Sequence, residues 1–304
     1  MSAAVTIVEV GPRDGFQPIG PFIPTERKFR FLQQLSACGL QDVEIGSFVS
    51  EKAVPQLADT PALLALTRGI PGLHPRVLVP TLGQGRKALA AGAPCLAFVL
   101  SVSEAHNRSN VRRAPEDSVK EYRDLAVSLP GNADMRLNLA TAFDCPFEGR
   151  VAADAVLRLL EPLIAALPRA EICLCDTTGR ADPAQVAGLF GVAIATFGRE
   201  RRWAFHGHDT YGLGAANVFA AFGQGVRVFD AAVAGLGGCP FAPGATGNVA
   251  TEDLVYMFEK MGVSTGCDLD GLVALASEAE AIPGAQPGGR VRHALAARCT
   301  LNLT

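Results

Sequence analysis

Short apolar runs alternate with longer amphipathic stretches along most of the chain. Eight of the runs are rich in β-branched or other apolar residues and are short enough to be strands. They span residues 6–10, 42–46, 76–80, 95–100, 135–140, 171–175, 203–208 and 228–235. The stretches between them show the apolar spacing that is typical of helices. The clearest predicted helices span residues 25–39, 115–129, 149–167, 182–198, 214–225 and 249–262.

This alternation predicts the fold class. Near-continuous apolar strands separated by helices indicate a parallel sheet that is covered by helices. We therefore expect an α/β fold in which the sheet closes into a (β/α)8 TIM barrel. An open doubly wound sheet is the alternative, but no G-x-G-x-x-G motif follows the first strand, so the dinucleotide-binding version is not favoured. In the first predicted helix, Thr25 is expected to be the N-cap and Gly39 to end the helix.

We expect residues 1–304 to form a single domain, with the barrel spanning about 5–262. The C-terminal extension, residues 267–304, contains a helical segment, a Pro/Gly-rich break and a second helical segment. We expect this helical extension to pack on the barrel.

Composition and charge exclude several classes of protein. The chain has 304 residues, of which 49% are hydrophobic, and this is enough for a full core. A net charge of -3 and a pI near 6.0 give no basic surface, so no nucleic acid partner is expected. No run of 18 uncharged apolar residues and no secretory leader is found, so we expect no membrane association and a cytoplasmic location.

The eight cysteines are scattered, and in a chain of this length they fit reduced thiols in the cytosol better than disulfides. Cys173 and Cys175 form a C-x-C pair on a predicted strand. No second cysteine pair lies nearby, so apolar packing is favoured over a zinc site.

Polar residues gather where the predicted strands end, which in a TIM barrel is the end that carries the active site. These residues follow or end five of the strands: Arg13, Asp14, Gln17, Glu44, Ser47, Asn138, Thr141, Asp176, Thr177, His206 and His208. The polar side chains are therefore expected to converge on one rim of the barrel. We take Arg13, Gln17, Ser47, Asn138 and Thr177 as candidate substrate-binding residues.

The stretch FHGHDTYG carries a candidate metal site. His206 and His208 lie two residues apart on a strand, so their side chains point to the same face and suit two ligands of one ion. Asp14 can be a third ligand and Asn248 a fourth. Two nitrogens, two hard oxygens and open positions favour Mg²⁺ or Mn²⁺ over a closed zinc site. In the alternatives, the histidines are hydrogen-bonded strand residues, and Asp14 caps the first helix or pairs with Arg13.

Cys239 lies in GLGGCPFAPGATG, after the eighth strand. The density of glycines predicts a mobile loop, and a thiol on such a loop favours proton transfer over core packing. An incidental small apolar residue is the alternative.

Six ordered motifs together resemble the 3-hydroxy-3-methylglutaryl-CoA lyase family, within the metal-dependent barrels that also include isopropylmalate and homocitrate synthases. The motifs are GPRDGFQ, SFVSEKAVPQLAD, DCPFEG, DTTG, HGHDTYG and GLGGCPFAPGATGNVATEDLVYM. The likeness extends from Val5 to about Gly266.

The resemblance implies a (β/α)8 fold and cleavage of an acyl-CoA to acetyl-CoA and a keto acid. It implies a metal ion bound by Asp14, His206, His208 and Asn248, which is the set expected above for Mg²⁺ or Mn²⁺. It further implies that Arg13 steadies the thioester oxygen, that Glu44 orders the site and that Cys239 handles a proton. With Asp14 and His206 these are the candidate catalytic residues. Barrels of this resemblance commonly pair, so a homodimer is expected.

The chemistry is consistent with these roles. Breaking the C2–C3 bond of a 3-hydroxyacyl thioester requires loss of the hydroxyl proton and stabilisation of an enolate. Arg13 can neutralise the developing charge, and a thiol on a closing loop can protonate the carbon. The general base that removes the hydroxyl proton can be Asp14, a metal-bound water or the thiolate of Cys239.

The sequence departs from the family pattern at several positions. Thr81 stands where the family has asparagine, Pro18-Ile19-Gly20 replaces a more polar pair, Phe16 replaces leucine, and Gly207 replaces a larger residue. We expect these changes to border the pocket for the acid end of the substrate. A related ester, such as a citramalyl-CoA, is therefore an alternative to 3-hydroxy-3-methylglutaryl-CoA.

Two other functions are alternatives to a lyase. A synthase that condenses acetyl-CoA with a 2-oxo acid is disfavoured by Phe16, Asp209, the GGCP loop and the absence of a long extra domain. A catalytically silent barrel that binds CoA esters or metal is disfavoured because no predicted ligand is lost and Arg13 is retained.

Overall fold

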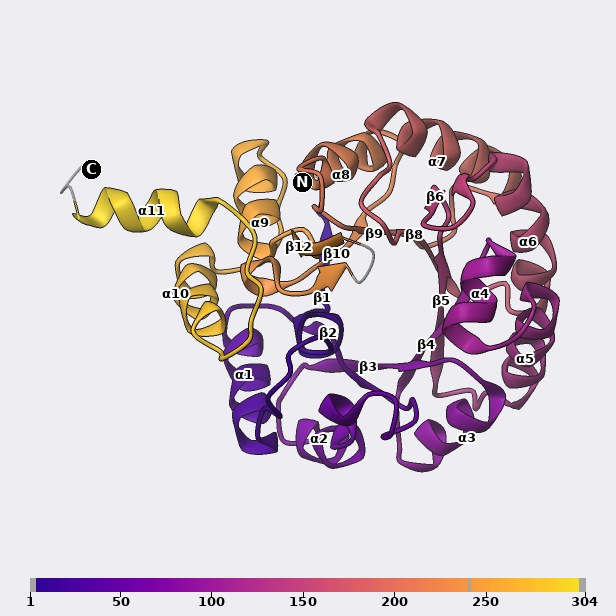
Figure 1. Cartoon of the computed structure of the whole chain (residues 1–304), viewed down its shortest axis with the longest axis horizontal. Helices are drawn as coiled ribbons and strands as arrows, with labels where there is room; N and C mark the ends of the chain where they lie inside the picture. Colours follow the sequence, from indigo (N-terminus) through magenta and orange to yellow (C-terminus); the bar gives the residue numbers. More distant parts are fainter. Residues whose placement is uncertain (1–3, 240–241, 301–304) are drawn as a thin grey trace.

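The computed structural model describes residues 4–239 and 242–300, and in this part of the chain eight parallel strands close into a barrel (Figure 1). The barrel strands are β1 (Thr6–Glu9), β2 (Asp42–Ser47), β3 (His74–Val79), β4 (Cys95–Ser101), β5 (Asp134–Ala140), β8 (Glu171–Asp176), β9 (Trp203–Gly207) and β10 (Val228–Ala231). They pair in chain order, and β10 closes the barrel on β1. The predicted (β/α)8 barrel is confirmed, and each predicted run overlaps one of these strands.

Helices surround the barrel (Figure 1). They are α1 (Thr25–Ala37), α2 (Thr60–Thr67), α3 (Leu82–Ala90), α4 (Glu104–Val111), α5 (Pro115–Ser128), α6 (Ala153–Ala166), α7 (Pro183–Phe197), α8 (Gly214–Gly223) and α9 (Thr251–Lys260). Three of them, α2 to α4, were not assigned from the sequence. None of the described helices has the length and apolar character needed to cross a membrane.

The ends of α1 test two local predictions. The N-cap position is Pro24, and the hydroxyl of Thr25 donates to Asp59 Oδ2 at 2.9 Å, so the predicted Thr25 N-cap is wrong. Pro24 fits because its ring fixes φ near the value that this position has. Gly39 follows the last turn with φ +88°, a left-handed conformation that favours glycine, so the predicted end of the helix is confirmed.

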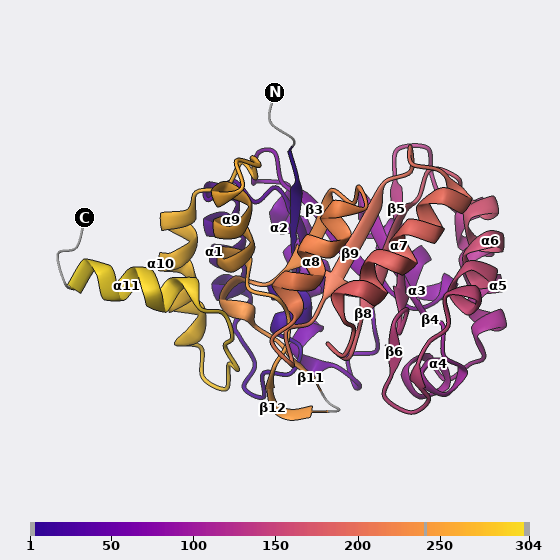
Figure 2. The same ribbon diagram turned by 90° about the horizontal axis from the view of Figure 1, so that it is seen from above.

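The C-terminal extension contains α10 (Leu269–Glu280) and α11 (Val291–Thr300). The amide of Asp268, at the start of α10, donates to Cys38 O at 2.9 Å and joins the extension to the end of α1. The segment between the two helices also contacts the barrel, because Gly288 N donates to Ala234 O at 2.7 Å. In both views α11 points away from the barrel (Figure 2).

Two short hairpins lie at the end of the barrel where the strands finish (Figure 2). One is formed by β6 (Asp144–Cys145) and β7 (Gly149–Arg150), and the other by β11 (Gly238–Cys239) and β12 (Ala242–Thr246). The rim that is expected to hold the active site is therefore bordered by irregular structure.

Candidate active site

Arg13 and Asp14 lie in a single wide turn, the π-helical segment η1 (Gly11–Gly15), directly after β1. The amides of Arg13, Asp14 and Gly15 all point to Val10 O, and the Asp14 bond is 2.7 Å long. A side chain at Gly15 would come within 2.9 Å of Leu236, so glycine lets this turn pack against the loop that follows β10. Such turns are frequent at functional sites because they redirect side chains. This turn directs the neighbouring side chains of Arg13 and Asp14 toward the rim of the barrel.

Asp14, His206 and His208 converge as the sequence predicts. Asp14 Oδ2 lies 3.9 Å from His206 Nε2 and 3.6 Å from His208 Nε2. One donor atom from each of the three residues lies within 4.8 Å of the others, which is close enough to hold a single metal ion. The two imidazole rings are 5.1 Å apart, as expected for neighbouring positions on one face of a strand.

Asn248 joins this cluster through the backbone. Residues 207–209 pair with 247–249: Asp209 N donates to Gly247 O at 2.7 Å and Val249 N donates to Gly207 O at 3.2 Å. The amide Nδ2 of Asn248 donates to Asp14 Oδ2 at 2.9 Å, whereas its Oδ1 is buried and has no hydrogen-bond partner in the described part of the chain. A buried acceptor without a donor normally costs stability, so Oδ1 is suited to a ligand.

The charges of the cluster also favour a cation. Burial alone would raise the pKa of Asp14, but the Arg13 charge and a hydrogen bond to His208 hold that pKa well below its usual value. Burial would lower the pKa of His206, but its hydrogen bond to Asp230 and the charges around it raise the pKa to about 9. Burial and the charge of His206 lower the pKa of His208. The protein thus holds positive charge between two carboxylates, at the place where a divalent ion fits.

Arg13 is fixed between two carboxylates. Its Nε donates to Glu44 Oε1 and its Nη1 to Asp14 Oδ1. Burial opposes the charge of Arg13, but these carboxylates raise its pKa above the ordinary value, so the guanidinium stays charged. Pairing of Asp14 with Arg13 was an alternative to metal binding in the sequence analysis. The structure has both contacts, because one Asp14 oxygen faces Arg13 and the other faces the histidines.

The predicted substrate-binding residues have different surroundings. Ser47 is buried at the end of β2, and its Oγ has no hydrogen-bond partner in the described residues. Asn138 Oδ1 accepts from Arg136 Nε at 2.7 Å, and Thr177 Oγ1 accepts from the Thr141 amide at 2.9 Å. Gln17 is exposed beyond the η1 turn. Substrate contacts for these residues stay predictions.

Cys239 ends β11, but its side chain lies outside the described residues. The stem of its hairpin explains two of the glycines. A side chain at Gly237 would come within 2.8 Å of Asn248 Nδ2, and one at Gly247 would lie 2.6 Å from the Gly237 backbone. Close approach of two backbones accounts for these two glycines, so they are no sign of a mobile loop.

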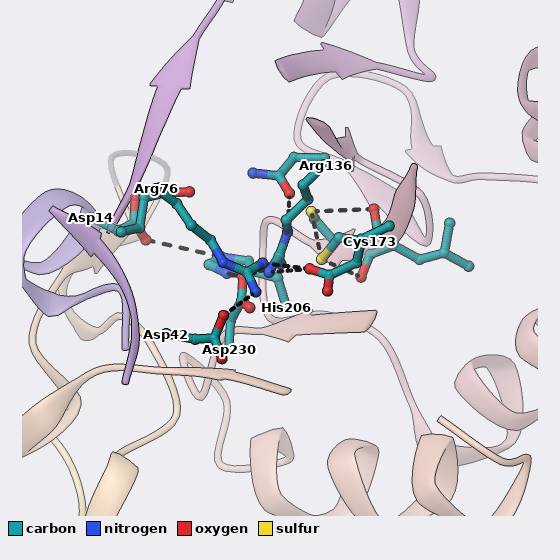
Figure 3. A network of polar contacts seen from close by, with 12 residues as sticks. Asp14, Asp42, Arg76, Arg136, Cys173, His206 and Asp230 are labelled. Atoms are coloured by element: carbon teal, nitrogen blue, oxygen red, sulfur yellow. Dashed lines mark hydrogen bonds and ion pairs between the residues drawn. The ribbon is translucent and has the colours of Figure 1, made fainter. Parts of the chain in front are cut away.

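A buried ion network inside the barrel was missed by the sequence analysis (Figure 3). Its members interrupt the apolar runs of four strands: Arg76, Arg136, Glu171 and Asp230. A charged residue at the start or in the middle of an otherwise apolar run was the available signal. The predicted Cys173 and Cys175 pair lies buried beside this network, with sulfur atoms 3.9 Å apart.

Two of the family departures, Phe16 and Gly207, do not face the site, which corrects the prediction that they border the substrate pocket. Phe16 packs on Phe31 and lines a groove between α1 and α10 on the outside of the barrel. Thr81 follows β3 and caps α3 by accepting from Gln84 N at 3.0 Å, and its place at the pocket stays a prediction. A side chain at Gly207 would come within 2.8 Å of the Phe205 ring, because alternation turns this position away from the histidines.

Comparison with known proteins gives consistent matches over most of the chain. The HMGL-like family model matches residues 4–278. Hydroxymethylglutaryl-CoA lyase YngG of Bacillus subtilis is 40% identical over 276 residues, which cover 90% of this chain and 91% of that protein. The (R)-citramalyl-CoA lyase of Chloroflexus aurantiacus is 38% identical over 283 residues, 89% of this chain and 88% of that protein. A solved HMG-CoA lyase from Acinetobacter baumannii, in complex with coenzyme A and 3-methylmalate, has a TM-score of 0.89 and 38% identity, with 97% of both chains covered.

Proposed function

Because the chain belongs to the HMGL-like family of carbon–carbon lyases, we propose that it cleaves a 3-hydroxyacyl-CoA to acetyl-CoA and a keto acid with the help of a divalent metal ion. The observation that carries this proposal is the convergence of Asp14, His206 and His208 at the barrel mouth, with the charged Arg13 beside them. The coenzyme A bound by the Acinetobacter baumannii lyase supports a CoA ester as substrate.

The residues that would hold the ion are Asp14, His206 and His208, with the unpartnered Oδ1 of Asn248 as a fourth ligand. Bound Mg²⁺ or Mn²⁺ would polarise the substrate hydroxyl, lower its pKa and fix its orientation. The donor set of two imidazoles, one carboxylate and one amide suits such an ion and leaves positions for substrate oxygens.

Arg13 is assigned to the thioester oxygen. When the hydroxyl proton leaves, C3 becomes the carbonyl carbon of the keto acid and the C2–C3 bond breaks. The electron pair of that bond stays with the thioester fragment, which becomes an enolate. A guanidinium held in place before this charge develops stabilises it without reorganisation. Glu44 and Asp14 hold Nε and Nη1, so the Nη2 donors of Arg13 remain for the substrate.

Proton transfer is assigned to the β11–β12 hairpin, which carries Cys239. Cys239 is the proposed acid that protonates C2 of the enolate to give acetyl-CoA. Asp14 is a poor general base, because Arg13 keeps the pKa of its carboxyl low and both of its oxygens are engaged. This leaves a water molecule or the Cys239 thiolate to take the hydroxyl proton.

We propose 3-hydroxy-3-methylglutaryl-CoA as the first substrate to test. A citramalyl-CoA is the second, because the Chloroflexus aurantiacus lyase matches this chain at 38% identity. A panel of 3-hydroxyacyl-CoA esters, assayed for acetyl-CoA release by the purified protein, separates the two. Binding of these esters without any turnover would instead support a catalytically silent barrel.

The metal is tested in the same assay. Treatment with EDTA should abolish acetyl-CoA release, and Mg²⁺ or Mn²⁺ should restore it. The His208→Asn variant should lose this response, whereas His293→Asn, at an exposed position on α11, should keep it. Arg13→Met and Cys239→Ser should each lower kcat by roughly 10²–10⁴-fold, the usual contribution of a charge-stabilising or proton-transferring group. Full turnover in EDTA would contradict the proposed mechanism.

A further inference from the structure

The two histidines of the candidate metal site differ in what lies behind them. His206 Nδ1 lies 3.1 Å from Asp230 Oδ2, while its Nε2 faces Asp14. His208 also turns Nε2 toward Asp14, but its Nδ1 is buried without a hydrogen-bond partner in the described residues. His206 is therefore held from behind by a carboxylate, and His208 is not.

Asp230 is itself held from across the barrel. Arg136 Nη2 donates to Asp230 Oδ2 at 2.6 Å, and both side chains are almost fully buried. Arg136 lies on β5 and Asp230 on β10, and two strands, β8 and β9, separate them in the barrel wall. The contact therefore crosses the interior of the barrel.

The other donors of Arg136 are also engaged, and they fix its orientation. Its Nε donates to Asn138 Oδ1 at 2.7 Å, and its Nη1 donates to Glu171 Oε1 at 3.1 Å. Three partners on three sides leave the planar guanidinium one position. Arg136 can therefore hold Asp230 in a defined place.

The network continues away from the site (Figure 3). Glu171 Oε1 also accepts from Arg76 Nη1 at 2.5 Å, and Arg76 Nη2 donates to Asp42 Oδ1 at 2.6 Å. Asp42 begins β2, so it lies near the end of the barrel opposite the candidate metal site. Asp42 and Asp230 are thus the two outer carboxylates of one network, and Asp230 is the one that contacts a predicted metal ligand.

The geometry decides which nitrogen of His206 is available. Asp230 Oδ2 already accepts from an arginine, so it is an ionised acceptor and the His206 Nδ1 beside it must carry a proton. In the neutral form of the ring, which is the form that binds a metal ion, the lone pair then lies on Nε2, the nitrogen that faces Asp14. A carboxylate that fixes the tautomer and orientation of a metal-binding histidine raises metal affinity.

We propose that Asp230, oriented by Arg136, is a positioning residue that presents His206 Nε2 to the metal ion. This inference rests on the metal site of the proposed function. A purely structural network would brace the barrel without affecting metal binding. Metal affinity, measured apart from stability and turnover, distinguishes the two roles.

The experiment compares Asp230→Asn with Asp42→Asn as a matched control, since each variant removes one carboxylate that pairs with a buried arginine of the same network. The dissociation constant for Mn²⁺ is measured by electron paramagnetic resonance of the free ion, without any CoA ester, and Tm is measured in EDTA. Asp230→Asn should bind Mn²⁺ roughly 10- to 100-fold more weakly than the wild type. Asp42→Asn should lower Tm and leave the dissociation constant within twofold.

Equal Mn²⁺ affinity in Asp230→Asn and the wild type would overturn the proposal, as would an equal loss in Asp42→Asn. If Asp230→Asn does not fold, Arg136→Lys provides the test, because it keeps the charge and loses the fork that orients Asp230. Arg136→Lys should then weaken Mn²⁺ binding, and an unchanged affinity would overturn the proposal. If the wild type binds no Mn²⁺ at all, the metal of the proposed function has failed, which is a different result.

Discussion

Glu9 lies at the end of β1 and is fully buried, which makes the stability of the protein depend on pH. Its Oε1 accepts from Gly11 N at 2.9 Å and from Val233 N at 3.0 Å, and the hydroxyl of Thr251 donates to Oε2 at 2.6 Å. Burial outweighs these hydrogen bonds and raises the pKa of Glu9 from 4.5 to about 8. The folded protein therefore keeps a proton on Glu9 at a pH where the unfolded chain has lost it.

The sign and size of the effect follow from this difference. Stability that depends on the Glu9 proton is fully present below pH 4.5 and is lost as the pH rises through about 8. Within that window the free energy of unfolding falls by up to about 1.4 kcal/mol per pH unit for one proton. Glu9→Gln keeps the shape and most of the hydrogen bonds but does not ionise, so it should remove this loss.

The assay is chemical denaturation of wild type and Glu9→Gln from pH 5 to pH 8.5 in EDTA. The variant should match the wild type near pH 5 and become more stable as the pH rises, by a few kcal/mol at pH 8. Glu161→Gln, at an exposed position on α6, is the matched control and should show no such trend. A stability difference between Glu9→Gln and wild type that is the same at every pH would refute the reasoning.

Three other substitutions test the packing of the barrel and the charge of the site. Gly207→Ala should lower stability by about 1–3 kcal/mol, measured as a shift of Tm, because its methyl group would come within 2.8 Å of the Phe205 ring. Tyr122→Phe should leave Tm unchanged or raise it, since the Tyr122 hydroxyl is buried without a hydrogen-bond partner in the described residues; a clear loss of stability would show that the hydroxyl is satisfied. Arg13→Lys should keep Tm near that of the wild type but reduce kcat at least tenfold, because a lysine cannot bridge two carboxylates and still donate to a substrate oxygen; wild-type turnover would exclude a role for the guanidinium fork.

Most of the fold was predictable because each strand is a short apolar run whose type does not depend on distant partners. The run at residues 135–140, for example, is β5 almost residue for residue. Helix α4, by contrast, carries only polar residues besides one alanine and one valine, so its sequence has no apolar stripe to detect. The Thr25 N-cap was wrong because the proline before it already fixes the backbone entry to the helix.

The metal triad was predictable because barrel topology brings all strand ends to one rim, so Asp14 and the histidine pair had to meet. Contacts that cross the interior of the barrel could not be predicted, because they depend on which strands face each other after the barrel has closed. Arg136 reaches Asp230 only because β5 and β10 lie across the barrel from each other. The close approach of Gly237 to Gly247 was likewise hidden, because glycine-rich sequence is equally consistent with a flexible loop.

The barrel is sealed by β1 and β10, the first and last of its strands, and this order has a consequence for synthesis on the ribosome. Asp14 cannot pair with Asn248 until the ribosome has synthesised Asn248, which lies 234 residues later in the chain. For most of translation β1 has one unpaired edge, which can associate with other nascent chains. Substitutions that delay docking of β10 should therefore lower the yield of protein in cells more than they lower the stability of molecules that have already folded.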